Sequence, residues 1–122
     1  MSLFTPELLE SFDSSILPQP EADTLPPVIY TSEEFLEFER GAIFDHEWVC
    51  VGLASRIPDP GDWFTVDVNG ERLIITRDKE RVVRALSSVC QHRAQAICEG
   101  SGSSTTFKCP YHHWIYGLDG RL

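Results

Sequence analysis

Residues 108–116 read KCPYHHWIY, which places Cys109 three residues before His112 and four before His113. Upstream, VCQHRA at 89–94 places Cys90 two residues before His92. The full pattern is C-x-H, sixteen residues, C-x-x-H. Each pair lies where a predicted strand gives way to a loop, so two loops could bring one thiolate and one imidazole each to a common point. Four such soft or borderline ligands predict a metal site.

Three interpretations of this pattern compete. Structural zinc accepts two cysteines and two histidines in a tetrahedron, but C-x-H is tight for chelating one ion. A 2Fe-2S cluster relieves that difficulty if the cysteines hold one iron and the histidines the other. In the third interpretation the cysteines are buried core thiols and the histidines are surface residues. The two motifs together favour the cluster, because either motif alone would be a weak signal.

The stretches CQHRA and CPYHHW resemble the two cluster-binding loops of the Rieske iron-sulfur family. The resemblance implies that Cys90 and Cys109 hold an inner iron, and that His92 and His112 hold an outer iron near solvent. Three further residues are expected beside these ligands: Arg93, Trp114 and Tyr116. Of these, Tyr116 could donate a hydrogen bond to a cysteine sulfur.

Upstream stretches extend the resemblance over 29–122 and narrow it. FERGAIFDHEWVCVG, PDPGDWFTVDVNGERLIITRD and VRALSSVCQHR follow the order seen in the N-terminal domain of the large subunit of Rieske non-haem iron oxygenases, the aromatic-ring-hydroxylating dioxygenase type. In that family a second domain holds a mononuclear ferrous ion by two histidines and a carboxylate and hydroxylates the substrate. The resemblance therefore implies an electron-transfer domain with no catalytic residue in this chain.

The same resemblance implies the partners. The electron donor would be an NAD(P)H-dependent reductase or a ferredoxin, and the full-length protein would be a homo-oligomer, a trimer. Two alternatives stay open: a stand-alone Rieske ferredoxin and a zinc-stabilised interaction module.

Two residues depart from the family pattern. Ala94 stands where glycine is frequent, and His113 stands where glycine or alanine is common. A positive φ at residue 113 would cost a histidine about 1 kcal/mol or more. We therefore expect an ordinary backbone conformation there.

The predicted fold is an all-β, antiparallel Rieske-type sandwich with one preceding helix. The helix spans 32–44, with a capping box formed by Thr31 and Glu34. Asn69-Gly70 predicts a type I′ hairpin turn. Strand-like runs, the first of which would bury Cys50 in the core, occupy 48–54, 63–68, 72–77, 82–88, 105–108 and 114–118.

Composition sets the broad class. With 122 residues the chain suits one domain, here 29–122, preceded by an arm or linker at 1–28 that could start a short helix at Thr5-Pro6. A net charge of −9 disfavours binding to nucleic acid or to an anionic membrane surface. The absence of a signal peptide predicts a cytoplasmic protein. Cys98 lies between the two loops at no useful ligand spacing and is expected to be a buried or partly exposed free thiol. The turn at Asp119-Gly120, followed by two residues, predicts truncation of a longer protein.

Overall fold

The computed structural model describes residues 3–122 and divides the chain into two compact units. One unit ends at Trp48, and the other runs from Val49 to Leu122. The domain boundary predicted at residue 28 stays a prediction. Within 3–122, no helix combines the length and the apolar character that crossing a bilayer requires.

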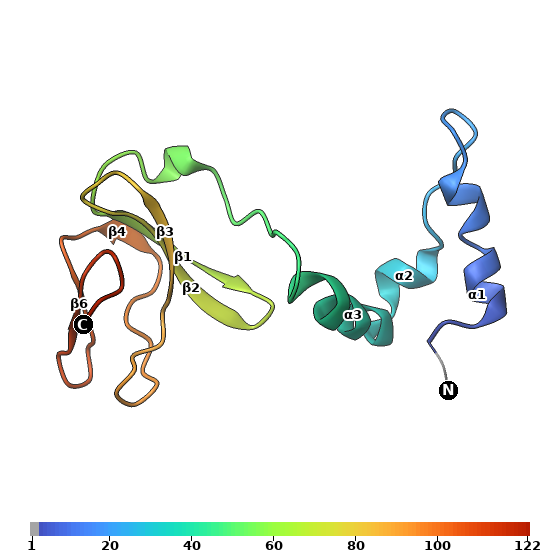
Figure 1. The fold of residues 1–122 in the computed structure, drawn as a ribbon. Helices are drawn as coiled ribbons and strands as arrows, with labels where there is room; N and C mark the ends of the chain where they lie inside the picture. The colour runs from blue at the N-terminus through green and yellow to red at the C-terminus, as the bar shows by residue number, and fades with distance from the viewer. Residues whose placement is uncertain (1–2) are drawn as a thin grey trace. The chain divides into compact units, whose positions relative to one another are not determined.

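The first unit is helical (Figure 1). Thr5 begins the first helix, because its side chain accepts a hydrogen bond from the backbone N–H of Leu8 at 3.2 Å, which confirms the predicted helix start. The helical segments are α1 (Pro6–Glu10), the 3₁₀ turn η1 (Asp13–Ile16), α2 (Pro27–Thr31), α3 (Glu33–Glu39) and the π-helical turn η2 (Arg40–Phe44).

The predicted capping box at the start of α3 is wrong. Ser32 is the N-cap and accepts from the N–H of Phe35 at 3.2 Å. Thr31 instead ends α2, and its hydroxyl donates to the carbonyl of Pro27 at 3.2 Å. Thr31 has a helical backbone, so its hydroxyl bonds back within its own helix. The helical stretch reaches Phe44 as predicted, although its last turn is π-helical.

The second unit contains two antiparallel sheets (Figure 1). The first has the order β3-β2-β1-β4, and the second pairs β5 with β6. Asn69 and Gly70, with φ of 49° and 86°, join β1 to β2 and confirm the predicted hairpin turn. The all-β prediction is confirmed by strands at Asp62–Val68, Glu71–Arg77, Val83–Ser87, Ser101–Ser103, Phe107–Lys108 and Ile115–Tyr116, β1 to β6 in order.

Two cores lie on opposite faces of β2. Successive side chains of a strand point to opposite faces, so Ile74 and Ile75 enter different cores. Ile75 packs with Ile57 and Phe64. Ile74 belongs to the larger core, whose other buried members are Cys90, Ile97, Phe107, Cys109, Tyr116 and Leu118. Both predicted cysteine ligands therefore belong to one core.

The strand predicted at 48–54 is wrong, and Cys50 is exposed rather than part of the core. β1 already has a partner on each side, because β2 and β4 flank it. The 3₁₀ turn η3 (Ala54–Arg56) that follows 48–53 is held by a side chain instead. Arg77 donates to the carbonyl of Ala54 at 3.3 Å and to that of Ile57 at 2.6 Å.

Candidate metal centre

Two six-residue loops present the predicted ligands, and their backbones close in the same way. In the first loop, Cys90–Gln95, the Cys90 N–H donates to the Gln95 carbonyl at 2.9 Å and the Ala94 N–H returns to the Cys90 carbonyl at 2.9 Å. In the second loop, 109–114, the Cys109 N–H donates to the Trp114 carbonyl at 2.8 Å, and the His113 N–H returns to Cys109 at 3.0 Å.

Flanking pairs fix where each loop starts and ends. The second loop connects β5 to β6, in which Phe107 pairs with Tyr116. The first loop is closed by an isolated antiparallel bridge between Val89 and Ala96. The buried residues beside these pairs place both loops at the larger core.

The residue four positions after each cysteine has a left-handed backbone. Ala94 has φ of 52° and His113 has φ of 63°. The expectation of an ordinary conformation at His113 is therefore wrong. The left-handed residue turns the chain back, so that the carbonyl of the next residue, Gln95 or Trp114, can accept the cysteine N–H. Histidine is among the non-glycine residues that adopt it more readily.

The two predicted cysteine ligands are buried side by side. Cys90 and Cys109 are each 2% exposed and belong to the same buried cluster. The Tyr116 hydroxyl lies 3.2 Å from the Cys90 sulfur and accepts from the Gln91 N–H at 3.0 Å. An amide N–H only donates, so the hydroxyl proton of Tyr116 is left for the sulfur. Tyr116 is therefore placed to donate to this sulfur, and its role beside a bound cluster stays a prediction.

This environment favours the thiolate of Cys90. The hydrogen bond from Tyr116 lowers the pKa of Cys90 most, and the backbone N–H groups of His92 and Arg93 lower it further, against the opposing effect of burial. The same bond raises the pKa of Tyr116. The thiolate is the form of cysteine that binds metals.

The two predicted histidine ligands are exposed and adjacent. The ring centroids of His92 and His112 lie 4.6 Å apart in an edge-to-face arrangement. Trp114 stacks on His92 with centroids 4.9 Å apart and planes 7° apart. The ring centroids of Tyr111 and His112 lie 3.8 Å apart, with an angle of 33° between the ring planes. The sequence did not predict this contact, although the two residues are neighbours in the chain.

Three other side chains near the loops differ in their exposure. Arg93 and His113 are both exposed. Cys98 is half-buried, and burial raises its pKa to about 11. A thiol of this kind stays protonated near neutral pH, as expected for a free cysteine outside the ligand set.

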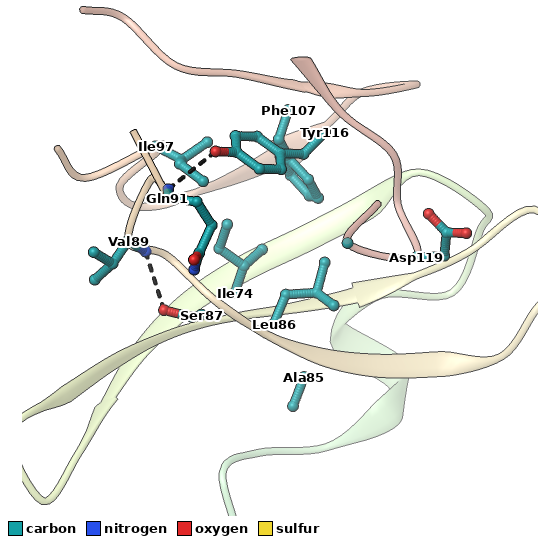
Figure 2. A pocket seen from close by; sticks show the side chains of 11 residues that line it. Ile74, Ala85, Leu86, Ser87, Val89, Gln91, Ile97, Phe107, Tyr116 and Asp119 are labelled. Carbon is teal, nitrogen blue, oxygen red and sulfur yellow. Dashed lines mark hydrogen bonds between the residues drawn. The ribbon is translucent and has the colours of Figure 1, made fainter. Parts of the chain in front are cut away.

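A cavity of about 350 Å³ lies beside the loops. Figure 2 shows Tyr116 along it, with its hydroxyl bonded to the backbone of Gln91. Ile74 and Leu86 contribute apolar walls, and Asp119 and Gly120 also line the cavity, with Gly120 next to Leu86. The hydroxyl that contacts Cys90 therefore belongs to a ring with free space on one side.

The donor set suits two metal ions better than one. The thiols form a buried pair and the imidazoles an exposed pair. Over residues 3–122, no group of three or more His, Cys, Asp or Glu side chains is arranged to hold a single metal ion. A Rieske [2Fe-2S] cluster takes two histidines on one iron and two cysteines on the other. The pairs fit that division, and the ligand set itself stays a prediction.

The family model of the Rieske [2Fe-2S] domain matches residues 47–122. The chain belongs to the Rieske [2Fe-2S] domain family. The predicted family and the 2Fe-2S cofactor of this domain are thereby confirmed.

The similar proteins include monooxygenases and their oxygenase subunits. The carnitine monooxygenase oxygenase subunit of Acinetobacter baumannii is 43% identical over 100 residues, covering 81% of this chain and 27% of the relative. The chloroplastic choline monooxygenase of Spinacia oleracea is 38% identical over 115 residues, covering 94% and 26%. A solved quaternary ammonium Rieske monooxygenase, studied for carnitine oxidation by gut microbiota and inter-subunit electron transfer, is 42% identical with a TM-score of 0.71, covering 80% and 27%. The chain spans about a quarter of their length.

Proposed function

We propose that this chain transfers electrons through a Rieske [2Fe-2S] cluster held by Cys90, His92, Cys109 and His112. The observation that carries the proposal is the two-pair arrangement, with thiols buried in the core and imidazoles exposed 4.6 Å apart. When bound, the cluster supplies a site that accepts and gives one electron.

The protein residues prepare this site in three ways. The core around Cys90 and Cys109 excludes water from the thiol pair. The Tyr116 hydroxyl holds its proton toward the Cys90 sulfur, which stabilises negative charge there. The exposed edges of His92 and His112 form the side that a redox partner can approach.

A matched pair of histidine variants tests the ligand set. We expect the wild-type protein to contain two irons and two sulfides per chain, with the low-average-g EPR signal of a Rieske centre after dithionite reduction. His112→Ala removes a ligand and should abolish that signal. His113→Gly changes the adjacent exposed imidazole and should leave the signal in place. A colourless protein with one zinc per chain would contradict the proposal.

The full-length protein is proposed to be a Rieske oxygenase that hydroxylates a quaternary ammonium compound. Carnitine and choline, named in two of the similar proteins, share that cationic group. The Rieske domain would be 29–122, and a following domain would hold the mononuclear iron. Electrons would come from an NAD(P)H-dependent reductase or a ferredoxin. Inter-subunit electron transfer in a similar protein supports a homo-oligomer, for which we propose a trimer.

The full-length gene product tests this second step. With a reductase and NADH, we expect oxygen consumption to depend on carnitine or choline and to stay at background with benzoate. Dependence on benzoate alone would contradict the substrate class. A full-length product that reduces a separate oxygenase, and hydroxylates nothing, would favour the ferredoxin alternative.

A further inference from the structure

The indole of Trp114 contacts the first loop from the end of the second. It lies parallel to the His92 imidazole, with planes 7° apart and centroids 4.9 Å apart. Trp114 itself is fixed on the other side: it is half-buried against the larger core. Its carbonyl also accepts the Cys109 N–H at 2.8 Å. A ring anchored in one loop therefore covers the histidine of the other.

The second histidine is covered differently. Tyr111 is the sequence neighbour of His112, is 55% exposed, and meets its imidazole at a tilt of 33°. This contact lies within one loop, and Tyr111 is not among the described residues that pack against the larger core. The two imidazoles are thus held unequally, and only His92 has a parallel aromatic plane against it among the described residues.

We propose that Trp114 is a positioning residue that fixes the plane of the His92 imidazole for metal binding. The inference rests on the proposed function, in which His92 is a ligand. An exposed histidine can rotate about two side-chain bonds, and binding a metal in one orientation removes that freedom. The stacked indole removes it beforehand, because offset aromatic pairs attract each other beyond simple burial. Partners that orient a ligand imidazole strengthen metal binding.

Three variants separate stacking from packing. Trp114→Leu keeps an apolar side chain but presents no plane, whereas Trp114→Phe keeps a flat ring. Tyr111→Leu is the matched control on the other histidine. The cluster-loaded chain is mixed with a chelator to measure the rate of iron release. The nitrogen hyperfine couplings of the two histidines are measured by pulsed EPR after reduction.

We expect Trp114→Leu to release iron about three- to tenfold faster than wild type and to change one of the two histidine couplings. Trp114→Phe should stay within about twofold of wild type. Tyr111→Leu should alter only the other coupling.

Equal rates and couplings for Trp114→Leu and Trp114→Phe would overturn the inference, because packing alone would then explain the contact. If that happened while wild type showed two histidine couplings, the ligand set would stand. Absence of two histidine couplings in wild type would overturn the ligand set and the inference together.

Discussion

The loops Cys90–Gln95 and 109–114 have the same backbone closure but carry their histidines at different positions. Both close with the same two hydrogen bonds and both have a left-handed residue four positions after the cysteine. Yet histidine follows cysteine by two residues in the first loop and by three in the second. With these unequal offsets, the ring centroids of the two imidazoles lie 4.6 Å apart. The common backbone closure places the two thiols. The number of residues between cysteine and histidine decides which side chain of each loop reaches the other loop.

Equalising the offsets should break the site completely. Exchanging residues 92 and 93, as His92→Arg with Arg93→His, gives the first loop the spacing of the second. We expect loss of the Rieske EPR signal, because ligand positions must hold to about 0.2 Å for metal binding. Arg93→Gln, which leaves His92 in place, is the control and should retain the signal. A retained signal in the exchanged variant would show that the loop tolerates either offset.

Removing the Tyr116 hydroxyl, which contacts the cysteine sulfur of the first loop, should change the reduction potential. Tyr116→Phe deletes the donor 3.2 Å from the Cys90 sulfur. Loss of one hydrogen bond of about 1 kcal/mol destabilises the reduced, more negative state. The midpoint potential should fall by about 40 mV, since 59 mV corresponds to a tenfold change for one electron. Redox titration measures it, and Tyr111→Phe should leave the potential unchanged. An unchanged or higher potential in Tyr116→Phe would contradict the role of this hydroxyl.

A charged pair outside the loops should control acid stability without changing the cluster. Asp78 is 1% exposed and accepts from the Val82 N–H and from Arg84 Nε, both at 2.7 Å. Burial alone would raise the pKa of Asp78, but the hydrogen bonds from Arg84, Val82 and the Glu80 backbone, with the charge of Arg84, together outweigh burial and lower the pKa.

A lowered folded pKa fixes the sign of the pH dependence. The stabilisation from Asp78 is complete above its unfolded pKa of about 3.9 and is lost as pH falls through the folded value. Urea midpoints measured from neutral to acid pH should therefore fall less steeply for Asp78→Asn than for wild type. The EPR signal at neutral pH should not change. Parallel pH curves for the two proteins would exclude Asp78 as the source.

The smallest expected effect concerns the left-handed residue of each loop. Ala94→Gly relieves a conformation that costs an L-residue about 1–2 kcal/mol, partly offset by the larger unfolded-state freedom of glycine. We expect a gain of about 0.5–1 kcal/mol in the free energy of unfolding, measured by urea denaturation. His113→Gly should gain less, because histidine tolerates this region better. Destabilisation by Ala94→Gly would mean that packing of the Ala94 methyl group stabilises the fold by more than the left-handed backbone costs.

The sequence predicted features that depend on covalent spacing and missed those that depend on partners. Asn69-Gly70 predicts its turn by itself, whereas the left-handed backbone at His113 belongs to a loop closed by the hydrogen bond from the Cys109 N–H to the Trp114 carbonyl. β4 has the sequence Ser-Gly-Ser and no apolar alternation to predict it. The run 48–54 alternates well but pairs with no strand in the described chain.

Two adjacent hydroxyl residues show the same limit at finer scale. Thr31 and Ser32 are both suitable N-caps, and only the end of α2 decides between them. The paired Cys and His motifs, in contrast, can be read from spacing alone. The family, through the resemblance of those motifs, and the all-β class, through the alternating runs, were therefore predictable, and the details of loop closure were not.

Mössbauer spectroscopy of the protein loaded with ⁵⁷Fe tests the two-pair ligand set most directly. Because thiolate and imidazole donate electron density differently, the oxidised protein should show two ferric sites of equal area and unequal isomer shift. His113→Gly should give the same two sites. A single doublet from equivalent irons would contradict the division of cysteines and histidines between the two metal ions.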